Sequence, residues 1–161
     1  MTEFVEDTQQ KWDDGYSLTD VEYADGNWVG IFGNDFGGSA YSIGDSLTEF
    51  KSDVAQRRGQ GYDLVGVEYA EDAWVSVFAE DNRYSTKYAI AEDREEFQAK
   101  FEQRRDEGYD LIDFEQVDDL YLGIYEQLNP AVTEGLRLGS EIVISSILND
   151  TVPSLSSIQS Q

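Results

Sequence analysis

The chain has 161 residues, enough for one domain with a modest core, and a formal charge of −23 from 34 acidic and 11 basic side chains. This charge disfavours binding to bare nucleic acid or to an anionic membrane surface. The sequence has neither Cys nor His, which excludes disulfides, thiolate zinc sites, and the commonest general base and transition-metal ligand.

No apolar run approaches the length of about 18 residues that a membrane span needs. The N-terminal segment is acidic and lacks the apolar stretch of a signal peptide. We therefore expect a protein without a membrane span, located in the cytoplasm, although export by a non-classical route stays open.

One stretch organises the chain because it occurs three times. Its copies cover residues 15–32, 61–78 and 108–125, which read GYSLTDVEYADGNWVGIF, GYDLVGVEYAEDAWVSVF and GYDLIDFEQVDDLYLGIY. The copies begin 46 and then 47 residues apart. Self-similarity at such a period indicates a tandem repeat, in which each unit buries a face against its neighbour.

A helix is predicted before each copy. Phe4, Phe50 and Phe97 each lie 11 residues before the glycine that opens the copy, so we expect them to occupy equivalent buried positions. The segments 46–49 and 93–96 fit capping boxes, which mark two of the helix starts. The glycine after each helix suits a left-handed cap.

Strands are predicted after each helix. Alternating apolar residues indicate a β-hairpin in every copy, and Asp25-Gly26 is a strong turn signal in the first. The second hairpin strand is apolar in both phases, so we expect it to be covered on both sides. A small residue between its aromatics suggests close approach of a neighbouring backbone. These small residues are Gly30, Ser76 and Gly123. A third strand is predicted near 41–43 and 88–90.

The repeat pattern stops at Asn129-Pro130, and Pro at a helix start favours a helix over about 131–148. We expect this helix either to fold back as a cap on the third repeat or to dock on another molecule. It is apolar on more than one side, which favours a second contact surface, such as one for a like subunit. Its candidate contact residues are Leu136, Ile142, Ile144 and Ile147. The last residues are rich in Ser and Gln, and we expect them to be mobile.

The W-x-x-G-Y motif at residues 12–16, followed by an alternating strand and by a strand that Trp28 leads, resembles a known repeat pattern. It is similar to bacterial tandem repeat modules of about this length and to repeats at the C-termini of some plant casein-kinase-like proteins. Arg58 and Arg105 replace the motif's Trp in the later copies. The resemblance covers about residues 2–127. It implies a non-catalytic accessory or binding module and brings no catalytic residues with it.

Aromatic residues lead the second strand of each copy. They are Trp28, Trp74 and Tyr121. As candidate binding residues, they would form a stacking platform for sugars or peptide. The alternative is that they form the core between neighbouring units, and the need of each repeat to bury a face on its neighbour favours this alternative.

A glutamate recurs at one position, as Glu22, Glu68 and Glu115. A carboxylate pair among them is the chemistry of a glycosidase, but the pattern favours a solvated strand face or pairing with the arginines that end the helices. Acidic turns, such as the one at 118–119, offer the oxygen ligands that calcium prefers. Because Asp and Asn are ordinary turn residues and no complete calcium loop occurs, we expect no metal and no cofactor, with calcium as a weaker alternative.

The sequence predicts an α+β fold of tandem repeats, each a helix plus an antiparallel β-meander, which form a curved sheet with the helices on one face. The repeat domain spans 1–128, with units at about 2–44, 45–91 and 92–128, and a C-terminal helix and tail occupy 129–161. We expect a non-catalytic module for protein–protein interaction, with a protein partner or a like subunit bound through the C-terminal segment. The alternatives are a carboxylate-dependent glycan hydrolase and a carbohydrate-binding module.

Overall fold

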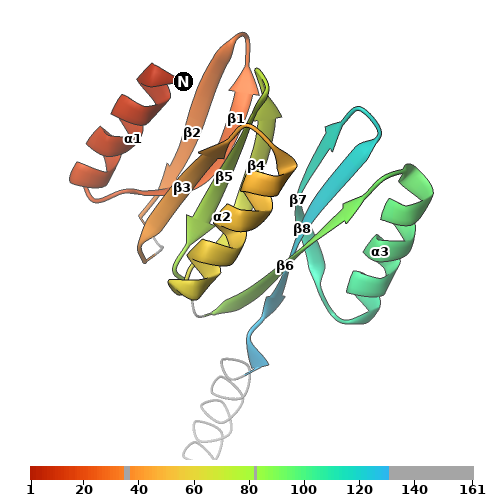
Figure 1. Cartoon of the computed structure of the whole chain (residues 1–161). Coiled ribbons are helices and arrows are strands. Elements are labelled where there is room, and N and C mark those ends of the chain that lie inside the picture. The colour runs from red at the N-terminus through yellow and green to blue at the C-terminus, as the bar shows by residue number, and fades with distance from the viewer. Residues whose placement is uncertain (35–36, 82, 131–161) are drawn as a thin grey trace, which may run out of the picture. The chain divides into compact units, whose positions relative to one another are not determined.

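The chain alternates helices with antiparallel strands (Figure 1). The computed structural model describes residues 1–34, 37–81 and 83–130. Its helices in these ranges are α1 (Thr2–Asp13), α2 (Leu47–Gly59) and α3 (Arg94–Asp106). Its strands there are β1 (Ser17–Ala24), β2 (Asn27–Gly33), β3 (Ser39–Gly44), β4 (Asp63–Ala70), β5 (Ala73–Ala79), β6 (Tyr84–Ala91), β7 (Asp110–Val117) and β8 (Leu120–Leu128). The class is α+β with repeated helix–strand units, as the sequence predicts.

Capping boxes begin two of the helices, which confirms the sequence signals. The Ser46 hydroxyl accepts a hydrogen bond from the backbone N–H of Glu49 at 3.3 Å, and the Asp93 carboxylate accepts one from Glu96 at 2.8 Å. The two glutamates complete the box, because each accepts a hydrogen bond from the backbone N–H four residues earlier. These contacts satisfy N–H groups that a helix start leaves unpaired.

A glycine ends each helix and turns the chain toward the sheet. The φ angles of Gly15, Gly61 and Gly108 are 86°, 92° and 86°. The backbone N–H of the next residue returns to the last helical turn, as when Tyr16 donates to the carbonyl of Lys11 at 2.9 Å. Only glycine takes up such a φ angle without strain, so the Gly-Tyr motif sets the direction in which each first strand leaves its helix.

The third strand of each repeat pairs with the next repeat instead of its own hairpin. β3 lies beside β5 and β6 beside β8, so the three sheets have the orders β1-β2, β3-β5-β4 and β6-β8-β7. The structure therefore differs from the predicted meander and from a single curved sheet. A repeat period does not reveal this exchange, because the period is the same whichever hairpin the third strand joins.

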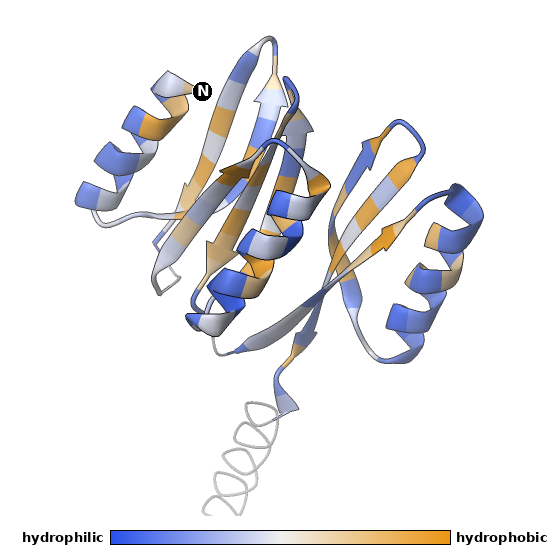
Figure 2. Ribbon diagram, in the orientation of Figure 1, coloured by the Kyte–Doolittle hydropathy of each residue, from blue (hydrophilic) through white to orange (hydrophobic). Residues whose placement is uncertain are grey.

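The strand register gives each sheet two distinct faces. Leu18 lies opposite Phe32 on the side that α1 covers, which we call the helix face. Glu22 lies opposite Val29 on the reverse side, which we call the carboxylate face. The equivalent glutamates on the carboxylate faces of the second and third sheets are Glu68 and Glu115. In Figure 2 the strands carry most of the apolar residues, whereas the helices are largely polar.

The small residue in each second strand makes room for the aromatic ring two positions later. A Cβ atom on Gly30 would lie 2.7 Å from the ring of Phe32, and one on Gly123 would lie 2.9 Å from the hydroxyl of Tyr125. Ser76, the equivalent residue in the second sheet, is buried. The predicted close approach of a neighbouring backbone is therefore wrong for the two glycines, since a side chain of the same strand fills the space.

The repeated helix phenylalanines are not equally buried. Phe4 and Phe50 are 3% and 1% exposed, as the shared spacing predicts. Phe97 is only partly buried, and its ring contacts those of Phe114 and Tyr121. The register of the repeat is correct, but the third repeat gives its helix less cover.

Residues 1–127 form one compact unit. None of the helices in the described ranges is long and apolar enough to cross a membrane. The predicted helix over 131–148 and the tail lie outside the described residues. So do the candidate contact residues Leu136, Ile142, Ile144 and Ile147.

Candidate binding surfaces

Neighbouring units pack helix face against carboxylate face. Val75 and Val77, on the carboxylate face of the second sheet, belong to the same apolar cluster as Leu18 on the helix face of the first. Leu122, on the carboxylate face of the third sheet, clusters in the same way with Leu64 of the second. The array is therefore built from one kind of interface that is used twice.

Carboxylates on the buried faces hold the first strands together. The Glu68 carboxyl accepts a hydrogen bond from the backbone N–H of Tyr23, and Glu115 accepts one from Tyr69. The first strands of the units belong to three different sheets, as β1, β4 and β7, and no strand ladder joins them. Side chains bond the backbone groups that such a ladder would otherwise pair. The recurring glutamate thus has a structural reason to recur.

Burial raises the affinity of these carboxyls for protons. It raises the pKa of Glu68 to about 7, and the negative charges of Glu115 and Glu22 contribute to the same shift. Burial also raises the pKa of Asp113 to about 6, although this residue accepts a hydrogen bond of 2.7 Å from the backbone N–H of Val67. Burial also raises the pKa of Glu115, and a hydrogen bond with the Glu68 carboxyl partly offsets this rise.

The carboxylate face of the first sheet is uncovered in the described part of the chain. Val29 and Ile31 are 46% and 45% exposed. Their equivalents in the other two sheets are all 0% exposed: Val75, Val77, Leu122 and Ile124. Since the positions are equivalent within one repeated fold, the difference arises because no sheet in the described ranges covers this face.

Within the described ranges β2 also lacks a strand along one edge, where β5 and β8 are paired with β3 and β6. A groove of about 420 Å³ runs between α1 and β2. Its lining includes Phe4, Thr8, Lys11, Trp28 and Phe32. Thr8 of α1 is the equivalent of Val54 of α2. Val54 belongs to the same apolar cluster as Ala40 of β3. The groove therefore lies where the other units hold their third strand.

Polar groups in this groove lack the partners that a third strand would offer. The Thr8 hydroxyl and the indole N–H of Trp28 are buried and have no hydrogen-bond partner among the described residues. Lys11 lines the same groove, and its equivalent, Arg57, donates to the backbone carbonyl of Tyr41 in β3 at 3.1 Å. Unpaired buried polar groups are costly, but these two atoms are enclosed by the protein. It is Lys11, by analogy with Arg57, that favours a ligand with hydrogen-bond acceptors in the groove.

The helix face of the third sheet forms the opposite open end. Leu111 and Phe114 are 36% and 42% exposed. Their equivalents in the first two sheets are at most 2% exposed: Leu18, Leu64, Val21 and Val67. The ring of Phe50 contacts Tyr88 of the following sheet at 5.5 Å, whereas in the described ranges Phe97 has no following sheet to contact.

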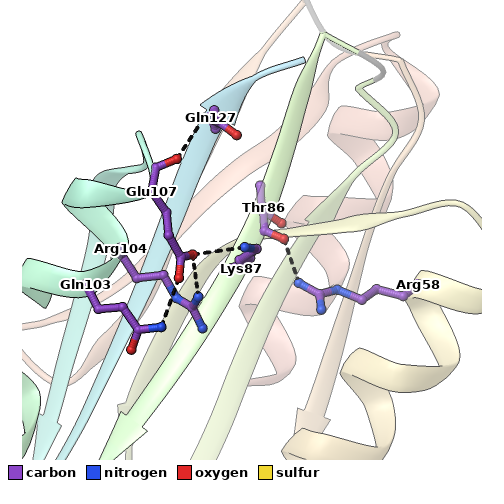
Figure 3. A network of polar contacts seen from close by, with 7 residues as sticks. All are labelled: Arg58, Thr86, Lys87, Gln103, Arg104, Glu107 and Gln127. Carbon is purple, nitrogen blue, oxygen red and sulfur yellow. Dashed lines mark hydrogen bonds and ion pairs between the residues drawn. The ribbon is translucent and has the colours of Figure 1, made fainter. Parts of the chain in front are cut away.

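Residues at the helix ends hold the third strand of the following unit (Figure 3). Arg58 of α2 donates to the backbone carbonyl of Thr86 in β6 at 2.9 Å. Trp12, the equivalent in α1, donates from its indole N–H to the Ser39 hydroxyl in β3 at 3.0 Å. Arg105, the third equivalent, has a side chain that is 61% exposed. The departure from Trp to Arg in the motif thus preserves a hydrogen-bond donor.

A second polar network in Figure 3 joins β6 to the end of α3. The Glu107 carboxylate accepts hydrogen bonds from Gln103, Arg104 and Lys87 at 2.9, 2.8 and 3.1 Å. These bonds, with Gln103 contributing most, lower the pKa of Glu107 to about 2. Lys87 lies in β6, whereas the other members lie at the end of α3, so the network fastens β6 to α3.

The two tryptophans among the aromatic candidate residues belong to the apolar clusters that join neighbouring sheets. Trp28 and Trp74 are 8% and 5% exposed, and Tyr121 is partly buried. The Trp74 ring contacts those of Phe50 and Tyr69 at 5.6 and 4.8 Å. The two tryptophans therefore offer little free surface to a stacking ligand.

A cleft of about 370 Å³ opens where the three first strands converge. Each first strand has a register shift there, at Thr19, Val65 and Ile112, and all three residues line the cleft. Two carboxylates, Asp20 and Glu126, line it as well. Burial raises the pKa of both. The repeats thus form one concavity that is lined by two carboxyl groups.

The acidic turns have a conformational role. Asp25 and Asp118 both have a φ angle of 52°, in the left-handed region that tight hairpin turns require and that Asp tolerates better than most residues. Over the described ranges, no group of three or more acidic residues is arranged to hold a metal ion.

Sequence reasoning missed the groove and the open ends. The exchange of third strands had to be known before β2 could be recognised as the unpaired strand. One signal was nevertheless present in the sequence: Thr8 is polar where the equivalent residues, Val54 and Phe101, are apolar. A polar residue at an apolar helix position indicates a contact that differs from the one its equivalents make.

A family model described as a polyglycine hydrolase-like structural repeat matches residues 93–128. This segment comprises α3, β7 and β8, which is one helix with its hairpin. The comparisons with curated proteins and with solved structures found no match. The family match supports a repeat-type domain. The resemblance to the bacterial and plant repeats stays a prediction.

Proposed function

We propose that this chain is a non-catalytic module that binds protein by accepting an extended segment in the groove between α1 and β2. One observation carries the proposal: β5 and β8 each have a neighbouring strand on the edge where β2, in the described part of the chain, has none. Strand addition at a free edge gains affinity from backbone hydrogen bonds. The matched family is described as a polyglycine hydrolase-like structural repeat; the repeat in that description is compatible with a binding module, whereas the hydrolase in it fits the second candidate below. The proposal requires no cofactor.

The third strands of the other two units indicate what the groove would take. On the helix side, β3 carries only small residues: Ala40, Ser42 and Gly44. In β6, Ala89 and Ala91 are 7% and 0% exposed. Space for larger side chains is short, since a Cβ atom on Gly44 would lie 3.0 Å from the Cβ of Glu49. We therefore propose an extended peptide with a small residue at every second position as the ligand.

A synthetic peptide with the sequence of residues 38–45 copies β3 and tests the groove. Titrated into isotopically labelled protein, it should shift the amide resonances of α1 and β2 and slow hydrogen exchange along β2, because strand pairing protects backbone amides. A peptide of the same composition in scrambled order is the control. Absent shifts, or shifts spread equally over the three sheets, would show that the proposed groove is wrong.

Lys11 offers a matched pair of variants on an exposed position of α1. Lys11→Glu should weaken peptide binding by about tenfold, because it replaces a charged donor with an acceptor beside the peptide carbonyls. Lys11→Arg copies Arg57 of the next repeat and should retain binding. Both variants should unfold at the wild-type temperature. An equal loss of binding in the two variants would contradict the role assigned to Lys11.

A carboxylate-dependent hydrolase of glycans is the second candidate, favoured by the cleft that Asp20 and Glu126 share. A raised pKa suits a general acid. Glu68 and Glu115 are less suitable, because they lie within hydrogen-bonding reach of each other, closer than the roughly 5 Å of a retaining pair. Release of reducing sugar from a panel of glycans, abolished by both Asp20→Asn and Glu126→Gln, would establish this activity. No release by the wild type would dismiss it.

A further inference from the structure

We infer that the protein partner is a second copy of this chain, docked head to tail, with the carboxylate face of the first sheet in one copy against the helix face of the third sheet in the other. The inference rests on the proposed function, because it names the partner of the binding module. It uses the sheet faces at the two open ends. Val29 of the first face also lines the groove at the edge of β2, whereas Ile31, where the association variant is made, does not.

The internal interfaces of the chain provide the template for this contact. Val29 and Ile31, 46% and 45% exposed, stand where the later sheets place fully buried residues. Leu111 and Phe114, 36% and 42% exposed, stand where the earlier sheets place residues that are at most 2% exposed. The two ends therefore hold the two halves of an interface that the chain already forms twice. In a repeat array, such apolar end faces are interaction surfaces.

Polar groups at the two ends are matched in the same way. Glu22 is exposed, whereas its equivalent Glu68 accepts a hydrogen bond from the preceding unit. Arg105 is 61% exposed, whereas its equivalent Arg58 donates a hydrogen bond to the following unit, at the carbonyl of Thr86. The first sheet therefore presents an exposed carboxylate, and α3 presents an exposed guanidinium beside Asp106 at 3.8 Å, as a head-to-tail contact requires.

The charges argue against a symmetric contact between identical faces. Such a contact would place the Glu22 carboxylates of two first sheets on the same buried surface, where like charges repel. A head-to-tail contact would instead copy the internal interfaces, where the equivalent Glu68 carboxyl accepts a backbone hydrogen bond from the preceding unit, and it closes into a ring or continues as a filament, depending on the rotation between copies. Each copy carries a formal charge of −23, so association should strengthen as salt screens the repulsion.

Sedimentation equilibrium of the full-length chain at increasing concentration, in about 0.5 M salt to shorten the screening length, tests the association. The mean mass should rise with concentration. Ile31→Glu and Phe114→Glu should each weaken self-association by about tenfold or more, because a charge would be buried in an apolar contact. Leu111→Glu is a second variant of the third sheet, should Phe114→Glu fold poorly. Val5→Glu changes an exposed apolar residue of α1 and should associate as the wild type does.

Mixing the variants distinguishes the head-to-tail contact from every other arrangement. The Ile31→Glu copy retains an intact third sheet, and the Phe114→Glu copy retains an intact first sheet. An equimolar mixture should therefore form a heterodimer of one copy each and nothing larger, at concentrations where each variant alone is monomeric. A symmetric contact would give no such rescue.

Three results would overturn the inference: a wild-type chain that stays monomeric at every concentration, association that neither variant weakens, or a mixture that remains monomeric. The groove is judged separately. A monomeric chain that binds the β3 peptide would remove the second copy as partner and leave the proposed function intact. A chain that associates through the sheet faces but does not bind the peptide would show that the proposed groove is wrong and would leave the second copy as the partner.

Discussion

The second sheet and the two end sheets place equivalent residues in different surroundings. The second sheet is covered on its carboxylate face by the first unit and on its helix face by the third. Val77 is accordingly 0% exposed, whereas its equivalent Ile31 in the first sheet is 45% exposed. On the opposite face, Val67 is 2% exposed and its equivalent Phe114 in the third sheet 42%. A repeat pattern thus specifies which positions are apolar enough to be buried. Whether the residue at such a position is buried depends on whether an adjacent unit covers it.

This difference divides the chain energetically. In a repeat array, stability is approximately the sum of each unit's own stability and of its interfaces with neighbours. The middle unit has two such interfaces, and each end unit has one. Substitutions at equivalent positions should therefore cost most in the middle, and measuring them tests whether the open ends are as uncovered in solution as in the structure.

The largest contrast is expected between Phe50 and Phe97. Phe50→Ala should lower the free energy of unfolding by about 3–5 kcal/mol, since it empties a fully buried ring position beside Trp74 and Tyr88. Phe97→Ala should lower it by about 1–2 kcal/mol, because its ring is already partly in water. Urea denaturation at low protein concentration measures both. Equal losses would mean that the third repeat is covered by something beyond the described residues.

The sequence alone predicted most of the repeat. The spacing of Phe4 and Phe50 from their glycines, the capping boxes at Ser46 and Asp93, and the Gly-Tyr helix ends all depend on contacts within about a dozen residues. Such contacts are visible in a single chain segment. They led to the correct fold class and to the correct register of every unit.

The exchange of third strands and the functional surfaces were not predictable in the same way. Pairing of β3 with β5 depends on which hairpin lies nearer in space, and alternation in the strand reads the same for either choice. The exposure of Ile31 or Phe114 depends on whether a further unit is present, and no local pattern contains that information. The same limit applies to Glu68, whose raised pKa arises from burial and from the charges of Glu115 and Glu22 in other repeats.

A smaller contrast is expected on the carboxylate faces. Val77→Ala should cost about 2 kcal/mol, from the lost methyl groups and the small cavity left between the first two sheets. Ile31→Ala, at the equivalent exposed position, should change stability by less than about 0.5 kcal/mol, although it removes more carbon atoms. Thermal unfolding at low protein concentration, where copies remain separate, provides the comparison. A large loss in Ile31→Ala under these conditions would place a covering segment on the first sheet.

The carboxylates between the units should make stability depend on pH. Burial raises the pKa of Glu68 from 4.5 to about 7, so the folded state binds its proton more tightly than the unfolded state does. The free energy of unfolding should therefore fall as pH rises from about 4.5 to 7, and the loss is complete above that range. The groups that face Glu68 are Glu115, Glu22 and Asp113, all acidic, so no cation offsets the effect.

Glu68→Gln tests this, because the amide resembles the protonated carboxyl. After allowance for solvent screening at a partly exposed site, it should raise the free energy of unfolding at pH 8 by about 1 kcal/mol and leave it nearly unchanged at pH 4. Glu6→Gln, at an exposed position of α1, is the control and should keep a pH profile close to that of the wild type. A Glu68→Gln protein that is less stable than the wild type at pH 8 would refute the interpretation.

The smallest contrast separates the two motif arginines. Arg58→Ala removes a hydrogen bond to the carbonyl of Thr86 and the contact of the guanidinium with the Tyr88 ring, 5.7 Å from its centroid. It should lower the free energy of unfolding by about 0.5–1 kcal/mol, the usual net value of one such bond. Arg105→Ala removes a side chain that is 61% exposed and lies beside Asp106 at 3.8 Å, so its effect should stay below about 0.3 kcal/mol.

The two values should converge if copies associate head to tail, because Arg105 would then contact the next copy as Arg58 contacts β6. Measuring the pair of variants at low and at high protein concentration therefore tests the comparison itself: a difference between Arg58→Ala and Arg105→Ala that is independent of concentration would mean that the end of α3 stays open.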